Sequence, residues 1–469
     1  MKKQFRSKGL WMTVASVLLM LILAACGNGD NDTSSNVDWD FYTERAETFL
    51  LTLVDGDYDV AYEMLNPAMA DALDVAGIQG TWAENIAMAG AFQSIYEMDH
   101  FAEDGHYFVL ITSRHENSGM ITRIAFDEDR LVGGWRILEF PTLEDVGAIE
   151  TVGFNEYPVI IVEGTDFPIN AMLSMPDDVT DQIPGVIIVG GSGSHNMDGS
   201  APPIQPSPIY RDIAHYLAEN GIAVLRHDRR LFTHGGNTAF GGDLTLYEEL
   251  IEDALLAVEI LRADPRIDPD RIYIVGHSLG AMTAPRIHAE ADFAGLILLA
   301  GSPRHMLELL IEQSRNSIST TIELELASED DLADIIAGVD ELEELFNQLA
   351  DLSDEEAQET IVPVFGGMAY YYLDMLRHPF ETYVQDLMAP VLVMQPDRDF
   401  QILADVDFIL LQELFADRDN VTFLLYEELN HMFIPSAATN FIEHAESVIE
   451  GGQVDRTVLQ DIVAWILGQ

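Results

Sequence analysis

The chain has 469 residues, of which 48% are hydrophobic, and it carries a formal net charge of −57 with a single cysteine. So strong a negative charge repels nucleic acid and anionic lipid surfaces, and this excludes both as partners. One cysteine excludes a disulfide framework, so the fold must rest on hydrophobic cores, and the length favours two domains over one.

The first residues have the pattern of an export signal. A basic start, "MKKQFRSK", precedes an uncharged and mostly apolar stretch at residues 9–25, which is marginal in length for a membrane span. The stretch runs into "LAAC", which resembles the bacterial lipoprotein signal and predicts lipidation of Cys26. We therefore expect a signal peptide at residues 1–25 and a flexible polar tether at 26–36, with a plain signal anchor as the alternative. The protein would be exported and lipid-anchored to the cell membrane, facing the extracellular side.

The basic residues are distributed unevenly along the chain. All three lysines, Lys2, Lys3 and Lys8, lie in the leader, so arginine supplies the positive charge of the rest. Arginine stays charged at a pH at which lysine begins to lose its proton. Together with the acidity, this bias favours a saline or alkaline habitat, but it says nothing about the reaction.

Residues 37–145 read as helices followed by strands. Residues 42–65 have apolar side chains at helical spacing with a break at 55–57, and "HYFVLITSRHE", "GMITRIAFDED" and "GGWRILEF" then alternate as strands do. This order predicts a small α+β domain. It resembles the nuclear-transport-factor-2-like domains that precede hydrolase domains in exported bacterial proteins. We find no catalytic constellation in it and expect a spacer or a binding module.

From residue 150 to 469 the pattern changes to alternating strands and helices. "VIIVEG" and "NAMLSMP" look like an antiparallel pair, and apolar strands follow at 185–190, 222–227, 271–276, 294–300, 389–395 and 421–427, separated by helical segments. Short apolar strands between helices predict a mostly parallel sheet covered on both faces, an α/β fold. The alternation stops at about 302–386, where acidic helical patterns predict an inserted lid.

The stretch "VGHSLGA" follows the strand at 271–276 and centres on Ser278. Glycines on both sides of a serine permit a sharp turn between strand and helix, which exposes the hydroxyl at the positive end of a helix. The same pattern also occurs by chance as a plain turn. A serine needs a base to become a nucleophile, and the base needs a carboxylate that orients it.

Candidates for these partners follow the two later strands. Asp397 and Asp399 come after 389–395, and His431 comes after 421–427. The order Ser, Asp, His is that of serine hydrolases with a parallel sheet. The other histidines have plainer interpretations: His215 and His288 fall in helical patterns, His277 only adjoins Ser278, and His444 is expected at a solvated surface.

An oxyanion needs two backbone N–H donors. The amide of Leu279 is one candidate, and the glycine-rich loop at 190–194 offers the amide of Ser192 as the second. That loop matches neither the P-loop nor the dinucleotide-binding pattern. The sequence contains no His-Glu-x-x-His motif or cysteine–histidine cluster, so we expect neither a metal nor a cofactor.

Residues 150–469 resemble the α/β-hydrolase superfamily, in particular its bacterial esterase and dienelactone-hydrolase-like branch. The stretches that carry the resemblance are "VIIVGGSGSHNMDG", "LAENGIAVLRHDRRLFTHGG", "DPDRIYIVGHSLGA", "APVLVMQPDRDFQI" and "LNHMF". Relatives often have histidine where this chain has Gly190 and proline where it has Ser194. The resemblance implies Ser278 as nucleophile, His431 as general base and Asp399, flanked by Gln395 and Gln401, as the acid that orients it.

These parts predict a serine hydrolase that cleaves carboxylic esters of small to medium acyl chains. The segment "FGGMAYYYLDML" at 365–376 is a candidate lining of an acyl pocket, although packing of the lid explains it equally well. A peptidase, a thioesterase or an acyltransferase of the same fold stays open. A different class also stays open: a surface lipoprotein that binds a ligand through residues 37–140.

Overall fold

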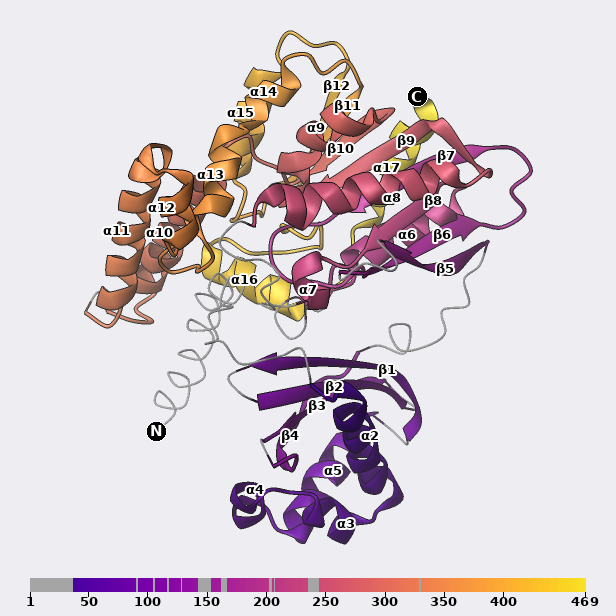
Figure 1. The fold of residues 1–469 in the computed structure, drawn as a ribbon, viewed down its shortest axis with the longest axis vertical. Coiled ribbons are helices and arrows are strands. Elements are labelled where there is room, and N and C mark those ends of the chain that lie inside the picture. Colours follow the sequence, from indigo (N-terminus) through magenta and orange to yellow (C-terminus); the bar gives the residue numbers. More distant parts are fainter. Residues whose placement is uncertain are drawn as a thin grey trace. The chain divides into compact units, whose positions relative to one another are not determined.

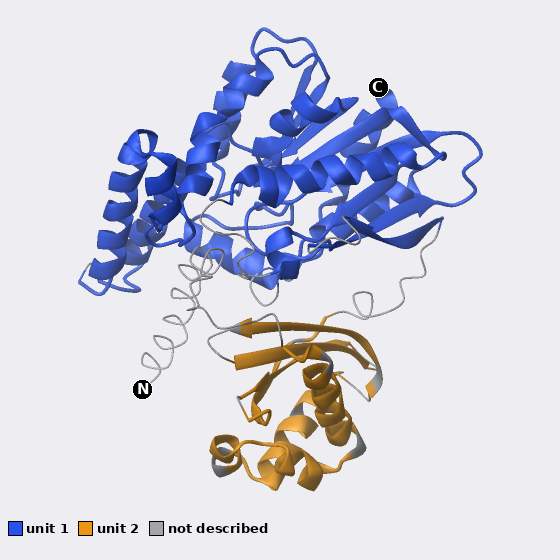
Figure 2. Cartoon of the chain, in the orientation of Figure 1, with its two compact units in different colours: residues 1–28, 151–469 blue, residues 29–150 orange. Residues whose placement is uncertain are grey.

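The computed structural model describes residues 37–89, 92–103, 106–115, 118–127, 129–141, 153–161, 167–201, 205, 207–234, 244–328 and 330–469. The leader, Cys26 and the tether lie outside these residues. The described residues form two compact units, one within 37–141 and one within 153–469, shown in different colours in Figure 2. None of the described helices is long and apolar enough to cross a membrane.

The first unit packs helices on one antiparallel sheet. Its strands pair in the order β1-β2-β3-β4, and its helices precede them: α2 (Trp39–Asp55), α3 (Tyr58–Glu63), α4 (Pro67–Ala72), α5 (Val75–Ala89), β1 (Phe92–Glu103), β2 (His106–His115), β3 (Gly119–Phe126) and β4 (Val132–Glu139). Gly56 ends α2 in the left-handed conformation, at the break expected from the sequence. Phe49, Leu50, Ile111 and Ile124 lie in its core. The small α+β domain is confirmed.

Strand β1 is absent from the sequence-based prediction. Its pairing with β2 shifts register between Phe92 and Ser94 and again between Ile95 and Glu97. Each bulge adds a residue and reverses which side chains face the core. The resulting sequence does not alternate, and this removes the signal by which strands are recognised.

The second unit is an α/β-hydrolase fold, as expected. Its sheet has the order β12-β11-β10-β9-β7-β8-β6-β5, in which β7 to β12 run parallel and β5 and β6 pair antiparallel. The strands are β5 (Phe154–Ile161), β6 (Ile169–Pro176), β7 (Ile183–Val189), β8 (Ala223–His227), β9 (Ile267–His277), β10 (Gly295–Leu299), β11 (Val391–Pro396) and β12 (Val421–Tyr426).

Helices cover both faces of this sheet (Figure 1). On one face α8 (Glu252–Ala263) and α9 (Leu279–Ala291) bury their apolar sides, and on the other α6 (Ile209–Glu219) and α17 (Arg456–Gly468) do so. Further helical segments are α7 (Arg230–His234), the π-helical turn Tyr247–Ile251, a second such turn Ala404–Phe408, α15 (Ile409–Leu414) and α16 (Phe441–Glu450). Because helices cover both faces of the sheet, the buried parts of its central strands, such as residues 272–275 of β9 and 296–299 of β10, are apolar runs.

The helices α10 (Met306–Glu323), α11 (Ala333–Gln348), α12 (Asp354–Glu359), α13 (Ala369–Arg377) and α14 (Phe380–Val384) lie between β10 and β11 in the chain. In Figure 1, α10, α11 and α12 stand together beside the sheet. Side chains of this insertion, such as Leu342 and Leu373, join the core that covers one face of the sheet. A partly buried ion pair at 2.7 Å between Arg286 of α9 and Asp374 of α13 holds the insertion against the sheet domain.

Candidate active site

Ser278 occupies a strained turn between β9 and α9. Its backbone has φ 53° and ψ −117°, a conformation that non-glycine residues rarely adopt. A Cβ on Gly276 would lie 2.4 Å from the Gly280 carbonyl oxygen, and one on Gly280 would lie 2.0 Å from the Val189 oxygen. Both glycines are therefore required by backbone contacts, and the turn has the form of a nucleophile elbow.

Hydrogen bonds fix this turn against the next strand. The Ser278 amide donates to the Leu299 carbonyl at 2.9 Å, and the Ser278 carbonyl accepts from Met282 at 3.0 Å. Since the serine's own amide is bonded, the donors left at this end are the first amides of α9, which have no acceptor within the helix. Leu279 supplies the first of them.

His431 and Asp399 form a buried pair at the ends of β12 and β11. The distance from His431 Nδ1 to Asp399 Oδ2 is 2.7 Å, and both side chains are almost fully buried. Asp399 Oδ1 also accepts the amides of Gln401 and Ile402 at 2.8 and 3.0 Å. Burial alone would raise the pKa of Asp399, but His431, followed by His444 and the Ile402 amide, outweighs burial and lowers it. Asp399 therefore stays ionised and holds the imidazole by its Nδ1–H.

Asp397 has a different environment. Its Oδ1 accepts the Glu428 amide at 2.6 Å, and its side chain is 30% exposed. It stabilises the loop after β12 and does not contact the imidazole. Of the two aspartates left open by position alone, only Asp399 contacts His431 among the described residues.

The loop that carries His431 is shaped by Asn430, which sequence reasoning missed. The fully buried Asn430 side chain accepts the amides of Met432 and Ile434 at 3.0 and 3.2 Å and donates to Ser447 Oγ at 3.0 Å. An asparagine that bonds amides two and four residues ahead makes a tight Asx-type turn. The only sequence signal for it is the asparagine directly before the histidine.

His277 joins the Ser278 turn to the His431 loop. Its Nε2 lies 3.0 Å from the His431 carbonyl oxygen, and its Nδ1 lies 3.0 Å from Tyr210 Oη. Tyr210 Oη in turn accepts the Gly191 amide at 2.8 Å. An amide can only donate and a carbonyl can only accept, so one proton arrangement fits: Tyr210 donates to Nδ1, and His277 carries its proton on Nε2.

The electrostatics agree with this arrangement. Burial, followed by the proximity of His431, lowers the pKa of His277 to about 3, so the ring is neutral. Burial also raises the pKa of Tyr210, which keeps its hydroxyl protonated. From the sequence, His277 has no expected role beyond adjoining Ser278, because its two partners are far from it in the chain.

The glycine-rich loop lies against Ser278. A Cβ on Gly191 would be 3.1 Å from Ser278 Cβ. Because the Gly191 amide is already bonded to Tyr210, the next amide along the loop, that of Ser192, is the candidate oxyanion donor there.

The structure thus brings Asp399 to His431, and it connects the His431 loop to the Ser278 turn through His277. Within the described residues the Ser278 hydroxyl makes no hydrogen bond with His431. Such contacts are often long in unliganded enzymes and tighten when substrate binds.

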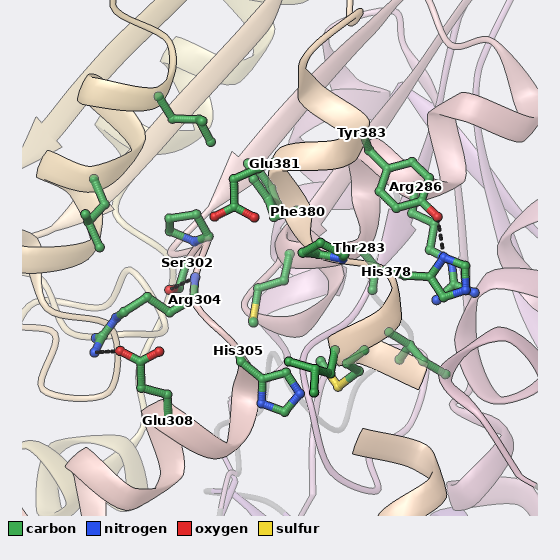
Figure 3. Close-up of a pocket in the computed structure, with 18 of the residues that line it drawn as sticks. Thr283, Arg286, Ser302, Arg304, His305, Glu308, His378, Phe380, Glu381 and Tyr383 are labelled. Carbon is green, nitrogen blue, oxygen red and sulfur yellow. Dashed lines mark hydrogen bonds and ion pairs between the residues drawn. The ribbon is translucent and has the colours of Figure 1, made fainter. Parts of the chain in front are cut away.

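A cavity of about 750 Å³ lies between α9 and the insertion (Figure 3). Met282, Thr283 and Arg286 of α9 line it, with Met375 and Leu376 of the segment 365–376. The ion pair of Arg304 with Glu308 and the hydrogen bond between His378 and Tyr383 stand at its edges. Ser278 and His431 are not among its lining residues. Tyr372, also in 365–376, is buried in the core.

His444 is not the solvated surface residue that we expected. It is 1% exposed, and its Nδ1 lies 3.1 Å from the Arg398 carbonyl oxygen. Its helix α16 buries Phe441, Ile442 and Ala445 on the same side.

In the described part of the chain, no group of three His, Cys, Asp or Glu side chains is placed to hold a metal ion.

Comparison with known proteins adds two family matches. Residues 186–444 match the model described as "Alpha/beta hydrolase family", and residues 46–134 match one described as a protein of unknown function, DUF3887. The chain is 28% identical over 435 residues to Esterase EstD of Thermotoga maritima, covering 91% of this chain and 95% of EstD.

Two solved structures are similar at low identity. Est1E from Butyrivibrio proteoclasticus is 17% identical with a TM-score of 0.39, and the match covers 66% of this chain and 99% of Est1E. A puromycin-hydrolyzing peptidase of Mycobacterium tuberculosis is 14% identical with a TM-score of 0.42, covering 78% of this chain and 46% of the peptidase.

Proposed function

Because the chain belongs to the alpha/beta hydrolase family, we propose that this hydrolase cleaves carboxylic esters through a covalent acyl-enzyme on Ser278. The observation that carries the proposal is the buried 2.7 Å contact between His431 and Asp399. A buried carboxylate on one ring nitrogen orients an imidazole as a base and stabilises the imidazolium that forms. The strained turn at Ser278 presents a hydroxyl group, and such a base would activate this hydroxyl as a nucleophile by removing its proton.

The proposed reaction has two halves. Ser278 Oγ attacks the ester carbonyl carbon while His431 Nε2 takes the hydroxyl proton, and the amides of Leu279 and Ser192 hold the oxyanion. His431 then gives its proton to the leaving alcohol. Water attacks the acyl-enzyme with His431 again as base, and the carboxylic acid leaves as Ser278 regains its proton. Asp399 stays ionised throughout. These steps need no metal and no cofactor.

The proposed substrates are esters of small to medium acyl chains. The 28% identity to an esterase along nearly the whole chain supports an ester over an amide. A peptidase, a thioesterase or an acyltransferase would use the same three side chains, and a ligand-binding protein would use none of them.

A panel of chromogenic acyl esters beside aminoacyl anilides and acyl thioesters tests the proposal. Ester turnover should fall about 10⁴-fold or more in Ser278→Ala, with folding unchanged. Ser194→Ala, which removes an exposed hydroxyl from the glycine-rich loop, should keep the wild-type rate. Cleavage of anilides alone would assign a peptidase, and a folded protein silent on every substrate would favour the binding protein.

We also propose that the protein acts outside the cell on a lipid anchor at Cys26, in a saline or alkaline setting, with the first unit as a spacer or binding module. The "LAAC" stretch and the absence of lysine beyond the leader support this. Metabolic labelling with palmitate should mark the wild type and not Cys26→Ser. The urea midpoint of unfolding of residues 37–469 should differ between low and molar salt if salt screens the acidic surface. Identical midpoints at the two salt concentrations would contradict a saline habitat.

A further inference from the structure

A buried arginine contacts the glycine-rich loop from the side of the sheet. Arg229 follows β8, is 2% exposed, and donates from Nη1 to the Gly191 carbonyl oxygen at 2.8 Å. The same nitrogen lies 3.4 Å from the Gly190 carbonyl oxygen. A charged donor at 2.8 Å in a buried site is a strong, directional contact. The orientation of the Gly191 carbonyl is therefore set by Arg229.

That carbonyl shares a peptide plane with the Ser192 amide. In a planar trans peptide the C=O and the following N–H point in opposite directions. Fixing the Gly191 oxygen on Arg229 therefore fixes the direction of the Ser192 N–H, away from the guanidinium. The Gly191 amide is held separately by Tyr210 at 2.8 Å, so the loop is fixed on both sides of Gly191.

His195 does not replace Arg229 as the donor. Its Nε2 is 3.3 Å from the Gly191 oxygen, and its Nδ1 is 3.0 Å from the Asn196 oxygen. Burial and the charge of Arg229 lower the pKa of His195 to about 4, so the ring is neutral near pH 7. A neutral ring has one N–H for two carbonyls. Arg229 is the permanently charged donor on this oxygen.

Arg229 is itself held by a buried carboxylate. Its Nη2 donates to Glu249 Oε2, and the Glu249 side chain is fully buried. Tyr371 Oη donates to the same oxygen at 3.3 Å, and Tyr371 belongs to α13 of the insertion. A continuous chain of hydrogen bonds thus runs from the insertion through Glu249 and Arg229 to the loop.

We propose that Arg229 is a positioning residue that aims the Ser192 amide at the reaction's oxyanion, and that Glu249 and Tyr371 hold Arg229 in place. This inference rests on the proposed serine-esterase function. It gives the insertion a second role besides covering the sheet: its α13 helps to set the geometry of the catalytic loop.

The test compares Arg229→Met and Arg229→Lys with Arg230→Met. Arg230 is also buried and ion-paired, with Asp253 and Glu252, but it makes no contact with the loop among the described residues. Loss of one aligned oxyanion donor lowers kcat about 10²-fold. We expect that loss in Arg229→Met with KM within about twofold, partial recovery in Arg229→Lys, and wild-type kcat in Arg230→Met.

A spectroscopic readout separates positioning from a general loss of structure. A trifluoromethyl ketone labelled with ¹³C at its carbonyl forms a hemiketal with Ser278, and NMR reports the pKa of its oxyanion. In Arg229→Met this pKa should rise by about two units, the equivalent of the ~10²-fold loss. Tyr371→Phe, which deletes one hydroxyl and should fold normally, should raise it by a fraction of a unit.

The outcomes are distinguishable. An unchanged hemiketal pKa in folded Arg229→Met would overturn the inference, while wild-type turnover and hemiketal formation leave the esterase proposal intact. If Arg229→Met does not fold, Tyr371→Phe tests the inference instead. A hemiketal pKa in Tyr371→Phe equal to that of the wild type would contradict the positioning role of the hydrogen bonds that run from Tyr371 through Glu249 to Arg229. A wild type that forms no hemiketal and cleaves no ester would overturn the proposed function itself.

Discussion

The imidazole of His277 donates to the backbone carbonyl of His431 at 3.0 Å, although 154 residues separate them in the chain. This bond joins the turn that presents the proposed nucleophile to the loop that presents the proposed base. The two rings lie 4.8 Å apart between centroids. The hydrogen bond from His277 therefore fixes the distance between the two loops without any contribution from a substrate.

Tyr210→Phe tests this connection. The substitution leaves His277 Nδ1 without a donor and the Gly191 amide without an acceptor in a buried site. We expect a loss of about 1–3 kcal/mol in the free energy of unfolding and a decrease in kcat of between about 10-fold and 100-fold from misplacement of the loops. Tyr216→Phe on the same helix α6 is the matched control. Equal kcat in both variants would contradict the role of Tyr210.

Substitutions of the two aspartates after β11 should have very different effects on kcat. Asp399→Asn leaves the imidazole facing an amide, which favours the wrong tautomer, so kcat should fall about 10⁴-fold. Asp397→Asn weakens the contact with the Glu428 amide and the 3.8 Å ion pair with Arg398, neither of which involves His431, and should keep kcat within about twofold. Steady-state kinetics of both variants decide the matter, and the reverse ranking would show that the acid was assigned to the wrong residue.

Because buried histidines such as His444 stay neutral in the folded state, we expect the free energy of unfolding to decrease in mild acid. Burial, as the largest cause, lowers the pKa of His444 from 6.5 to about 4, so the unfolded state binds a proton there between these values and the folded state does not. Stability therefore falls as pH decreases through this window. Urea melts of wild type and His444→Gln at pH 7.5 and 5 should differ in this loss by about 2 kcal/mol. An identical pH dependence in the two proteins would show that His444 is protonated in the fold.

The glycines at the elbow should tolerate no side chain. A Cβ on Gly280 would lie 2.0 Å from the Val189 oxygen and 2.8 Å from the Gly190 oxygen, and these backbone atoms cannot turn aside as a flexible side chain can. Gly280→Ala should destabilise the second unit by about 3 kcal/mol or more and abolish ester turnover. Gly468→Ala, where a Cβ would meet nothing within 4 Å, is the control. A thermal melt of Gly280→Ala that matches the wild type would show that the turn differs from the one described.

The sequence predicted those features that depend on local pattern. Buried parallel strands such as β7 and β10 are unbroken apolar runs, and Ser278 stands out because only glycines permit its turn. The choice of Asp399 over Asp397 came from the resemblance to a family, since position alone left both open. The parallel sheet, the insertion between its strands and the preceding α+β unit followed from the same patterns.

The missed residues share a physical reason. His277, Tyr210 and Arg229 act through backbone amides and carbonyls, which every residue possesses, so no pattern of residue types marks their partners. His444 was misjudged because helical periodicity does not show which face of α16 is covered. The cavity beside α9 depends on how the insertion packs, which is a tertiary property.

The most direct measurement is the mass of the acyl-enzyme. A slowly hydrolysed ester or a fluorophosphonate should add one adduct per chain, located by peptide mapping on the peptide that contains Ser278. The adduct should be lost in Ser278→Ala and form far more slowly in His431→Gln. Continued ester turnover with no adduct on Ser278, or with the adduct on another residue, would contradict the mechanism.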